Sequence, residues 1–111
     1  MVLSQSSMAS RRYLPPIEWL TDDGSWPDGP FAADVPIYAV TTAALVERLQ
    51  SCIDERGLSL RAVAVPAGMD PTSLSRLLTG KVVPDLGTIA GLEQALDVDL
   101  WPGRVSPAPH D

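Results

Sequence analysis

Apolar residues recur at helical spacing from residue 41 onwards. Leu45, Leu49 and Ile53 follow one another at four-residue steps, which is the repeat of a helix that buries one face. The threonine pair at 41–42 can cap the start of this helix, and Gly57 can supply the left-handed residue that ends it. The pattern therefore predicts one long first helix that closes at Gly57.

Shorter helices are predicted after Gly57, and a polar residue stands at the start of three of them. Ser59, Asp70 and Asp85 can each accept a hydrogen bond from the first backbone amides of a helix. The helices are expected over residues 59–67, 70–80 and 85–96, with a fifth and shorter one over 97–101. Their inner faces carry the side chains expected in the core: Val63, Ala64, Met69, Leu74, Leu77, Leu78, Leu86, Ile89, Leu92 and Leu96.

The first forty residues differ in kind from the rest of the chain. They hold five of the eleven prolines and five of the six aromatic residues, namely Tyr13, Trp19, Trp26, Phe31 and Tyr38. Each proline removes a backbone donor and restricts its predecessor, so a long helix is excluded. We expect one helical turn over 16–20, closed by residues 21–24, and a short strand over 34–40. Disordered linkers are poor in aromatic residues, so this arm is expected to pack against its own core or against a partner.

The turn over 67–70 joins two of the predicted helices in the manner of a helix-turn-helix. Gly68 can adopt the positive φ that a sharp turn needs. Once the leucines of the following helix are buried, its exposed face carries Thr72, Ser73 and Arg76. Hydroxyl groups can bond several base edges in a major groove, and a guanidinium can bond both O6 and N7 of guanine. This face is therefore a candidate DNA-reading surface.

These segments together resemble the lambda-repressor and Cro-type (XRE) family of helix-turn-helix proteins. The resemblance runs from Gly57-Leu58-Ser59-Leu60-Arg61 through Gly68-Met69-Asp70-Pro71-Thr72-Ser73-Leu74-Ser75-Arg76-Leu77-Leu78-Thr79-Gly80-Lys81 to Pro84-Asp85-Leu86-Gly87-Thr88-Ile89 and Leu96-Asp97-Val98. It implies an all-α fold, a five-helix domain over residues 41–103. A proline- and aromatic-rich N-terminal arm over 1–40 precedes this domain, and a tail over 104–111 follows it.

The resemblance also implies which residues contact DNA. The third helix of the family reads bases, which assigns that role to Pro71, Thr72, Ser73 and Arg76. The start of the second helix and the loop after the third bind phosphates, which assigns that role to Ser59, Arg61, Thr79 and Lys81, partly through backbone amides at the helix N-terminus.

Three positions depart from the family pattern. Pro66 lies inside the second helix and is expected to kink it or end it early. Leu60 stands at a base-contacting position and can offer only apolar contact. The pair at 102–103, proline and glycine, cuts short the fifth helix, which is a common dimer surface in the family. A dimer is therefore expected to use another face.

The net charge of −6 and the pI near 4.5 change this picture, because DNA-binding domains are usually basic. Acidic residues are spread along the chain, so the placement of the few cations decides whether one face can bind DNA. Two functions remain open. One is a bacterial or phage transcription regulator that binds double-stranded DNA as a homodimer on the nucleoid in the cytoplasm. The other is a protein-interaction module, an antitoxin or anti-repressor, whose arm binds a partner through Trp19, Trp26 and Phe31.

Other functional classes find no support in the sequence. It holds no nucleophile paired with a general base, no glycine-rich loop that could bind a phosphate and no metal-ligand cluster. No catalytic residue, cofactor or metal is therefore expected. Apolar runs are broken before the roughly 18 residues that a membrane span needs. Cys52 is the single cysteine and cannot form an internal disulfide. The first ten residues lack the order of a signal peptide, and a reducing intracellular setting is expected.

Overall fold

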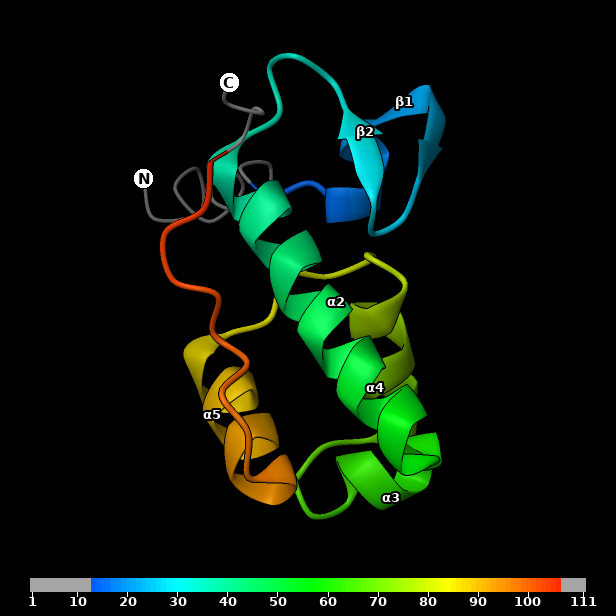
Figure 1. Cartoon of the computed structure of the whole chain (residues 1–111), viewed down its shortest axis with the longest axis vertical. Coiled ribbons are helices and arrows are strands. Elements are labelled where there is room, and N and C mark those ends of the chain that lie inside the picture. Colours follow the sequence, from blue (N-terminus) through cyan, green and yellow to red (C-terminus); the bar gives the residue numbers. More distant parts are fainter. Residues whose placement is uncertain (1–12, 107–111) are drawn as a thin grey trace, which may run out of the picture.

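The computed structural model of the chain describes residues 13–106. In order, these residues form η1 (Pro16–Trp19), β1 (Leu20–Ser25), β2 (Gly29–Phe31), α2 (Ile37–Arg56), α3 (Leu60–Ala64), α4 (Pro71–Leu78) and α5 (Leu86–Leu96). Figure 1 shows α2 as the long central helix, with α3 near its lower end, α5 on one flank and the β1–β2 hairpin beside its upper end. The part of the chain described here is therefore mostly helical, with one small antiparallel sheet.

The hydrophobic core lies between α2 and the shorter helices. Leu45, Leu49 and Ile53 of α2 are buried, as their four-residue spacing predicts. They form one cluster with buried side chains from the other helices and the segment after α5: Val63, Ala64, Leu74, Leu77, Ile89, Leu92, Leu96 and Leu100. Full burial of one such side chain stabilises a fold by about 1.5–3 kcal/mol. This cluster is therefore the scaffold on which α3 and α4 are mounted.

The three predicted helix caps all form. The accepting side chains and the backbone amides that they bind are Ser59 with Ala62 (3.0 Å), Asp70 with Thr72 (3.0 Å) and Asp85 with Thr88 (2.7 Å). Hydrogen bonds from the backbone amide and the side chain of Thr88 hold the pKa of Asp85 below its ordinary value. The starts of α3, α4 and α5 are therefore set by residues next to them in the sequence.

The first helix begins earlier than predicted. It starts at Ile37, after Pro36 in an extended conformation, so the strand expected over 34–40 is wrong. Thr41 and Thr42, the expected caps, lie inside α2 instead. Their hydroxyl groups donate to the carbonyls one turn earlier, Thr41 to Ile37 O and Thr42 to Tyr38 O, both at 2.8 Å. Pro36 lacks an amide hydrogen but costs nothing at this place, since the first turn of a helix leaves its amides unpaired.

The N-terminal arm forms a short 3-10 turn and a hairpin. The expected helical turn over 16–20 is present as η1, but residues 21–24, expected to close a helix, belong to strand β1. In the hairpin Leu20 pairs with Phe31 and Ser25 pairs with Gly29, with an irregularity between the two pairs. The all-α expectation is thus corrected by a two-stranded sheet. The pattern within one strand does not show which other residues it pairs with.

The fifth helix expected over 97–101 does not form. Asp97 adopts the left-handed conformation, with φ at 54°, and ends α5. The carboxylate of Glu93 then accepts hydrogen bonds from the backbone amides of Leu100 (2.8 Å) and Trp101 (3.0 Å). These bonds hold the pKa of Glu93 below its ordinary value. A side chain therefore satisfies the amides that a fifth helix would have used.

Leu86 is the one member of the predicted core that lies outside it. Its side chain is 80% exposed, because the first residue of α5 points away from the cluster, whereas Ile89 and Leu92 are buried. Along residues 13–106 we find no helix with the length and apolar content needed to cross a bilayer. The same residues contain no cluster of three or more potential metal ligands.

Candidate nucleic-acid interface

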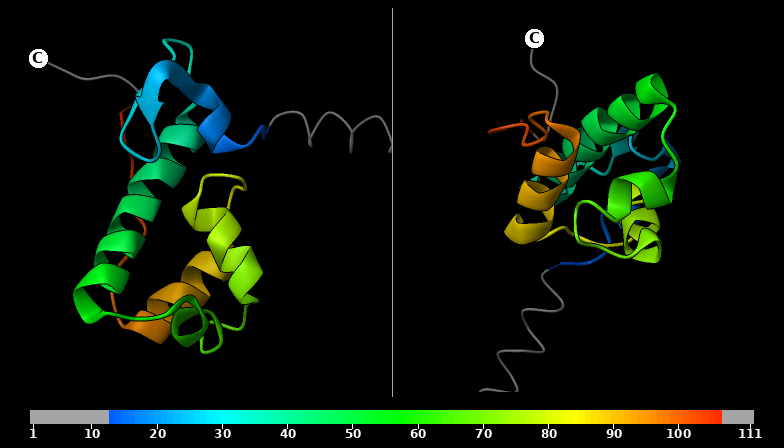
Figure 2. Two further views of the ribbon diagram at one scale, coloured as in Figure 1. Left: turned by 90° about the vertical axis from the view of Figure 1, so that its right-hand side faces the viewer. Right: turned by 90° about the horizontal axis from the view of Figure 1, so that it is seen from below.

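Helices α3 and α4 form the paired unit that the sequence predicts. α3 ends at Ala64, two residues before Pro66, so the expected early end is confirmed. The amide of Met69 donates to Ala64 O at 3.0 Å, and Gly68 takes a φ of 76° in the turn. In the left view of Figure 2, α3 and the turn after it lie at the lower end of α4. The turn therefore fixes how α4 starts relative to α3.

The two faces of α4 differ sharply in exposure. Leu74 and Leu77 are fully buried and fasten α4 to the core. Of the four residues expected to read bases, Thr72, Ser73 and Arg76 are exposed and Pro71 is half-buried. The structure therefore presents a polar stripe of three side chains on the outer face of α4.

All four residues expected to contact phosphates are exposed: Ser59, Arg61, Thr79 and Lys81. Their hydrogen-bonding capacity is not equal. The Ser59 Oγ accepts from an amide as a cap, so its hydroxyl hydrogen can still be donated. The Thr79 hydroxyl already donates to Ser75 O at 2.8 Å. Ser59 is therefore equipped to bind an anion, and Thr79 would first have to give up a bond.

The loop after α4 has its backbone amides occupied. The amides of Thr79, Gly80 and Lys81 donate to carbonyls within the last turn of α4, at 3.0, 3.1 and 2.9 Å. A phosphate at this loop would therefore meet the ammonium group of Lys81 and no free amide of residues 79–81. Sequence reasoning could not foresee this, because it depends on which carbonyl each amide reaches.

Three cations on this part of the molecule are available to bind an anion. Among the described residues, no side-chain hydrogen bond or ion pair engages Arg61, Arg76 or Lys81. By contrast, Arg48 donates to Trp101 O at 3.3 Å and Arg56 donates to Leu96 O at 2.7 Å. Arg48 and Arg56 therefore serve the fold, whereas Arg61, Arg76 and Lys81 make no such bond.

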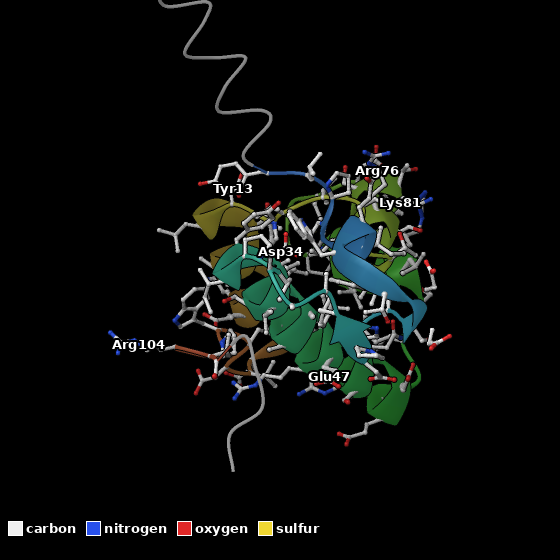
Figure 3. The ribbon with its side chains drawn as sticks, turned by 90° about the horizontal axis from the view of Figure 1, so that it is seen from above. Tyr13, Asp34, Glu47, Arg76, Lys81 and Arg104 are labelled. Carbon is white, nitrogen blue, oxygen red and sulfur yellow. The ribbon has the colours of Figure 1, made fainter. Side chains whose placement is uncertain are left out.

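The two cations at the end of α4 share one side of the molecule. Figure 3 shows Arg76 and Lys81 together at the upper edge of the view, with Tyr13 on the same side. Glu47 and Arg104 lie on other sides, away from α4. Two of the candidate phosphate- and base-binding cations therefore share one side of the molecule.

The hairpin reaches the C-terminal end of α4, a contact that the sequence did not indicate. The indole Nε1 of Trp26 donates to Leu78 O at 2.9 Å, and the amide of Ile17 donates to Gly80 O at 2.9 Å. In the left view of Figure 2 the hairpin lies directly above the loop that follows α4. In the sequence Gly80 marks only the end of a helix, and nothing in its position predicts contact with the hairpin.

The aromatic residues expected to bind a protein partner make contacts within the chain. Trp19 Nε1 donates to the Tyr38 hydroxyl at 3.1 Å, and that hydroxyl donates to Leu14 O at 2.9 Å. Trp26 and Phe31 meet edge to face, with ring centroids 6.2 Å apart. Of the two alternatives left open for the arm, packing on its own core is the one found.

Comparison with known proteins agrees with this geometry. The chain matches the family model described as a helix-turn-helix domain over residues 44–100, which is just over half of its length. No curated protein and no solved structure gives a match. The matched segment holds most of α2 and all of α3, α4 and α5, whereas the hairpin lies before it. By this match and by its paired α3 and α4, the chain belongs to the helix-turn-helix domain family of the lambda-repressor type.

Proposed function

We propose that the chain is a sequence-specific regulator of transcription that places α4 in the major groove of double-stranded DNA. The observation that carries this proposal is the division of α4 into a buried leucine face and an exposed face with Thr72, Ser73 and Arg76. A helix presented in this way fits the groove, and its polar side chains match base edges. The proposal includes no catalytic activity.

Each exposed residue has a role that follows from its chemistry. Arg76 donates two N–H groups of its guanidinium to O6 and N7 of guanine. Thr72 and Ser73, near the start of α4, bind other bases. Lys81 and Arg61 neutralise phosphates on either side of the groove, and Ser59 donates its hydroxyl hydrogen to a phosphate oxygen. Pro71 contributes apolar contact, and Thr79 contributes only after its bond to Ser75 O opens.

Two copies of the chain are proposed to act together on a partly palindromic site. Three free cations and four residues with hydroxyl groups form a small contact surface for one copy: Arg61, Arg76, Lys81, Ser59, Thr72, Ser73 and Thr79. Pairing two copies on adjacent half-sites multiplies the specificity that one short helix can reach. A homodimer bound to the bacterial nucleoid, in the cytoplasm, is the setting that fits this mode of action.

A protein-interaction module is the second candidate, and one surface favours it. Ile37, Val83, Pro84 and Trp101 line a shallow apolar depression, and the side chains of Ile37 and Trp101 are 50% and 54% exposed. Exposed apolar side chains that lie together in this way are typical of surfaces that contact another protein. An antitoxin or anti-repressor that used this surface would leave the exposed face of α4 without a function.

Selection from random duplex DNA at moderate salt tests the proposal. The wild type is compared with Arg76→Ala and with Arg104→Ala, a matched loss of charge on another side of the molecule. We expect one enriched symmetric motif for the wild type and for Arg104→Ala. Arg76→Ala should bind that motif about 5- to 150-fold more weakly, as for one lost bidentate contact worth roughly 1–3 kcal/mol. A folded wild type that enriches no motif at any salt would overturn the proposal.

A further inference from the structure

Trp26 binds the end of α4 from a distant part of the chain. Its indole Nε1 lies 2.9 Å from Leu78 O across a separation of 52 residues. Leu78 is the last residue of α4, and carbonyls in a last turn have no partner within the helix. The indole therefore supplies one of the missing donors at this helix end.

The ring of Trp26 also covers the residue that follows the helix cap. A Cβ added to Gly80 would lie 2.6 Å from the ring atom Cε2, so the backbone passes directly against the indole. Gly80 has a φ of 75°, and its carbonyl accepts the amide of Ile17 at 2.9 Å. Residues 78–80 are thus held on one side by the hairpin and the turn before it, which we call the brace (residues 16–31).

The brace acts next to two of the cations proposed to contact DNA. Arg76 lies two residues before Leu78, and Lys81 follows Gly80 directly. The amide of Lys81 donates to Arg76 O at 2.9 Å, so both backbones move as one unit. A bidentate contact to guanine tolerates displacements of about 0.5 Å and about 10–20°. A shift of residues 78–80 that moves Arg76 by more than about 0.5 Å would therefore weaken this contact.

We propose that Trp26 is a positioning residue for DNA recognition, which sets the placement of α4 and with it the guanidinium of Arg76. This inference rests on the proposed function. It goes further in assigning a role in specificity to a hairpin that lies outside the family segment at 44–100. The unit that reads DNA is then the helix-turn-helix together with the brace.

Trp19 provides a matched control for Trp26. Both tryptophans belong to the same N-terminal region, both are half-buried, and each donates one indole hydrogen bond. Trp19 binds the hydroxyl of Tyr38 on α2, a helix that carries none of the proposed DNA contacts. A general loss of stability would follow from either substitution, whereas a loss of positioning would follow only from a change at Trp26.

The experiment compares the wild type with Trp26→Ala, Trp26→Phe and Trp19→Phe at a temperature at which circular dichroism shows each protein folded. Affinity is measured on the selected site and on a random duplex, across a series of salt concentrations. For Trp26→Ala we expect the ratio of specific to non-specific affinity to fall about tenfold, within the range for one misplaced base contact. The salt dependence should stay the same, since no cation is lost. Trp26→Phe should lie between, and Trp19→Phe should change the ratio less than about twofold.

A double substitution tests the route of the effect. If Trp26 acts through Arg76, then Trp26→Ala should not lower the ratio further in a chain that already carries Arg76→Ala. Equal losses for Trp19→Phe and Trp26→Phe, or an unchanged ratio in Trp26→Ala, would overturn the inference and leave the proposed function standing. A wild type with no preferred site would overturn both.

Discussion

The two ends of α4 are held by different parts of the chain. At the N-terminal end the hydrogen bonds are local: Asp70 accepts the amide of Thr72 at 3.0 Å, and Met69 donates to Ala64 O at 3.0 Å. Pro71, the first residue of the helix, has its φ restricted by its own ring. This end carries Thr72 and Ser73, two exposed residues proposed to enter the groove, whereas Arg76 lies in the last turn of the helix.

The C-terminal end of α4 depends on residues that are far away in the sequence. Trp26 and Ile17 bind Leu78 O and Gly80 O, and the indole covers the backbone at Gly80. The difference teaches that neighbouring residues fix the start of α4, whereas residues distant in the sequence fix its end. A change at the N-terminal end should therefore act locally, whereas a change in the distant attachment at the C-terminal end should alter stability as well as binding.

The largest effect is expected from Gly80→Ala, which attacks the distant attachment. An alanine there would adopt a left-handed conformation at a cost of about 1–2 kcal/mol, and its Cβ would displace the Trp26 ring, at a further cost of about 1–3 kcal/mol for overpacking. Gly57→Ala is the matched control, because Gly57 also has a positive φ but no atom lies within 4 Å of the added carbon. The free energy of unfolding, from urea titrations, should fall more for Gly80→Ala. Equal losses of unfolding free energy in the two variants would mean that the Trp26 ring moves aside for the added methyl group at no cost.

A smaller effect is expected from Asp70→Asn, which alters the local attachment without breaking it. Asparagine caps helices about as well as aspartate, so the unfolding free energy should change by less than about 0.5 kcal/mol. The negative charge at the end of α4 that faces DNA is removed, however. Affinity for DNA at low salt should rise about 1.5- to 5-fold, the range of one exposed charge pair, and this gain should shrink as salt is added.

Glu47→Gln removes the same charge on another side of the molecule and is the control for Asp70→Asn. It should change DNA affinity less than Asp70→Asn does, because exposed charges farther apart than a Debye length are screened. Equal gains for the two variants would show that net charge alone matters, and that the end of α4 has no special place in binding.

The smallest effect concerns the segment after α5, which is held by a charge rather than by a neighbouring cap or a distant ring. The bonds from Trp101 and Leu100 lower the pKa of Glu93, so the stability that they provide is present above the unfolded pKa of about 4.3. It is lost as pH falls through the lower folded pKa. The unfolding free energy of the wild type should therefore fall more steeply below about pH 4.3 than that of Glu93→Gln. A constant difference between the two proteins from pH 7 to pH 3 would contradict this.

Much of the helical domain could be predicted from the sequence because its signals are local. The stripe of Leu45, Leu49 and Ile53 and the caps at Ser59 and Asp70 each depend on residues within one or two turns. The same holds for the exposed stripe of α4, since burying two leucines leaves only one face for the polar residues. Local periodicity and capping thus determine which residues the candidate interface offers.

The rest depended on contacts that no local pattern contains. Residues 97–101 were expected to form a helix, yet the amides of Leu100 and Trp101 are bound by the side chain of Glu93 from the preceding helix. The hairpin is specified by pairing between strands and by docking on α4. At the interface, exposure could be predicted for Thr79, but the bond that occupies its hydroxyl could not. The sequence therefore indicated which residues of the candidate interface are exposed, and it missed the bonds that restrain them.

The brace also fixes the order in which the molecule can be completed during synthesis. Trp26 is made 52 residues before Leu78, and at about 5–20 residues per second this interval lasts about 3–10 s. Joining them closes a long loop, at an entropic cost of about 3.5 kcal/mol, so docking has to wait until the core has formed. The hairpin, which is made before the helices, is then the last of these elements to be attached. A nascent chain released before residue 78 would keep Trp26 without the helix end that it binds.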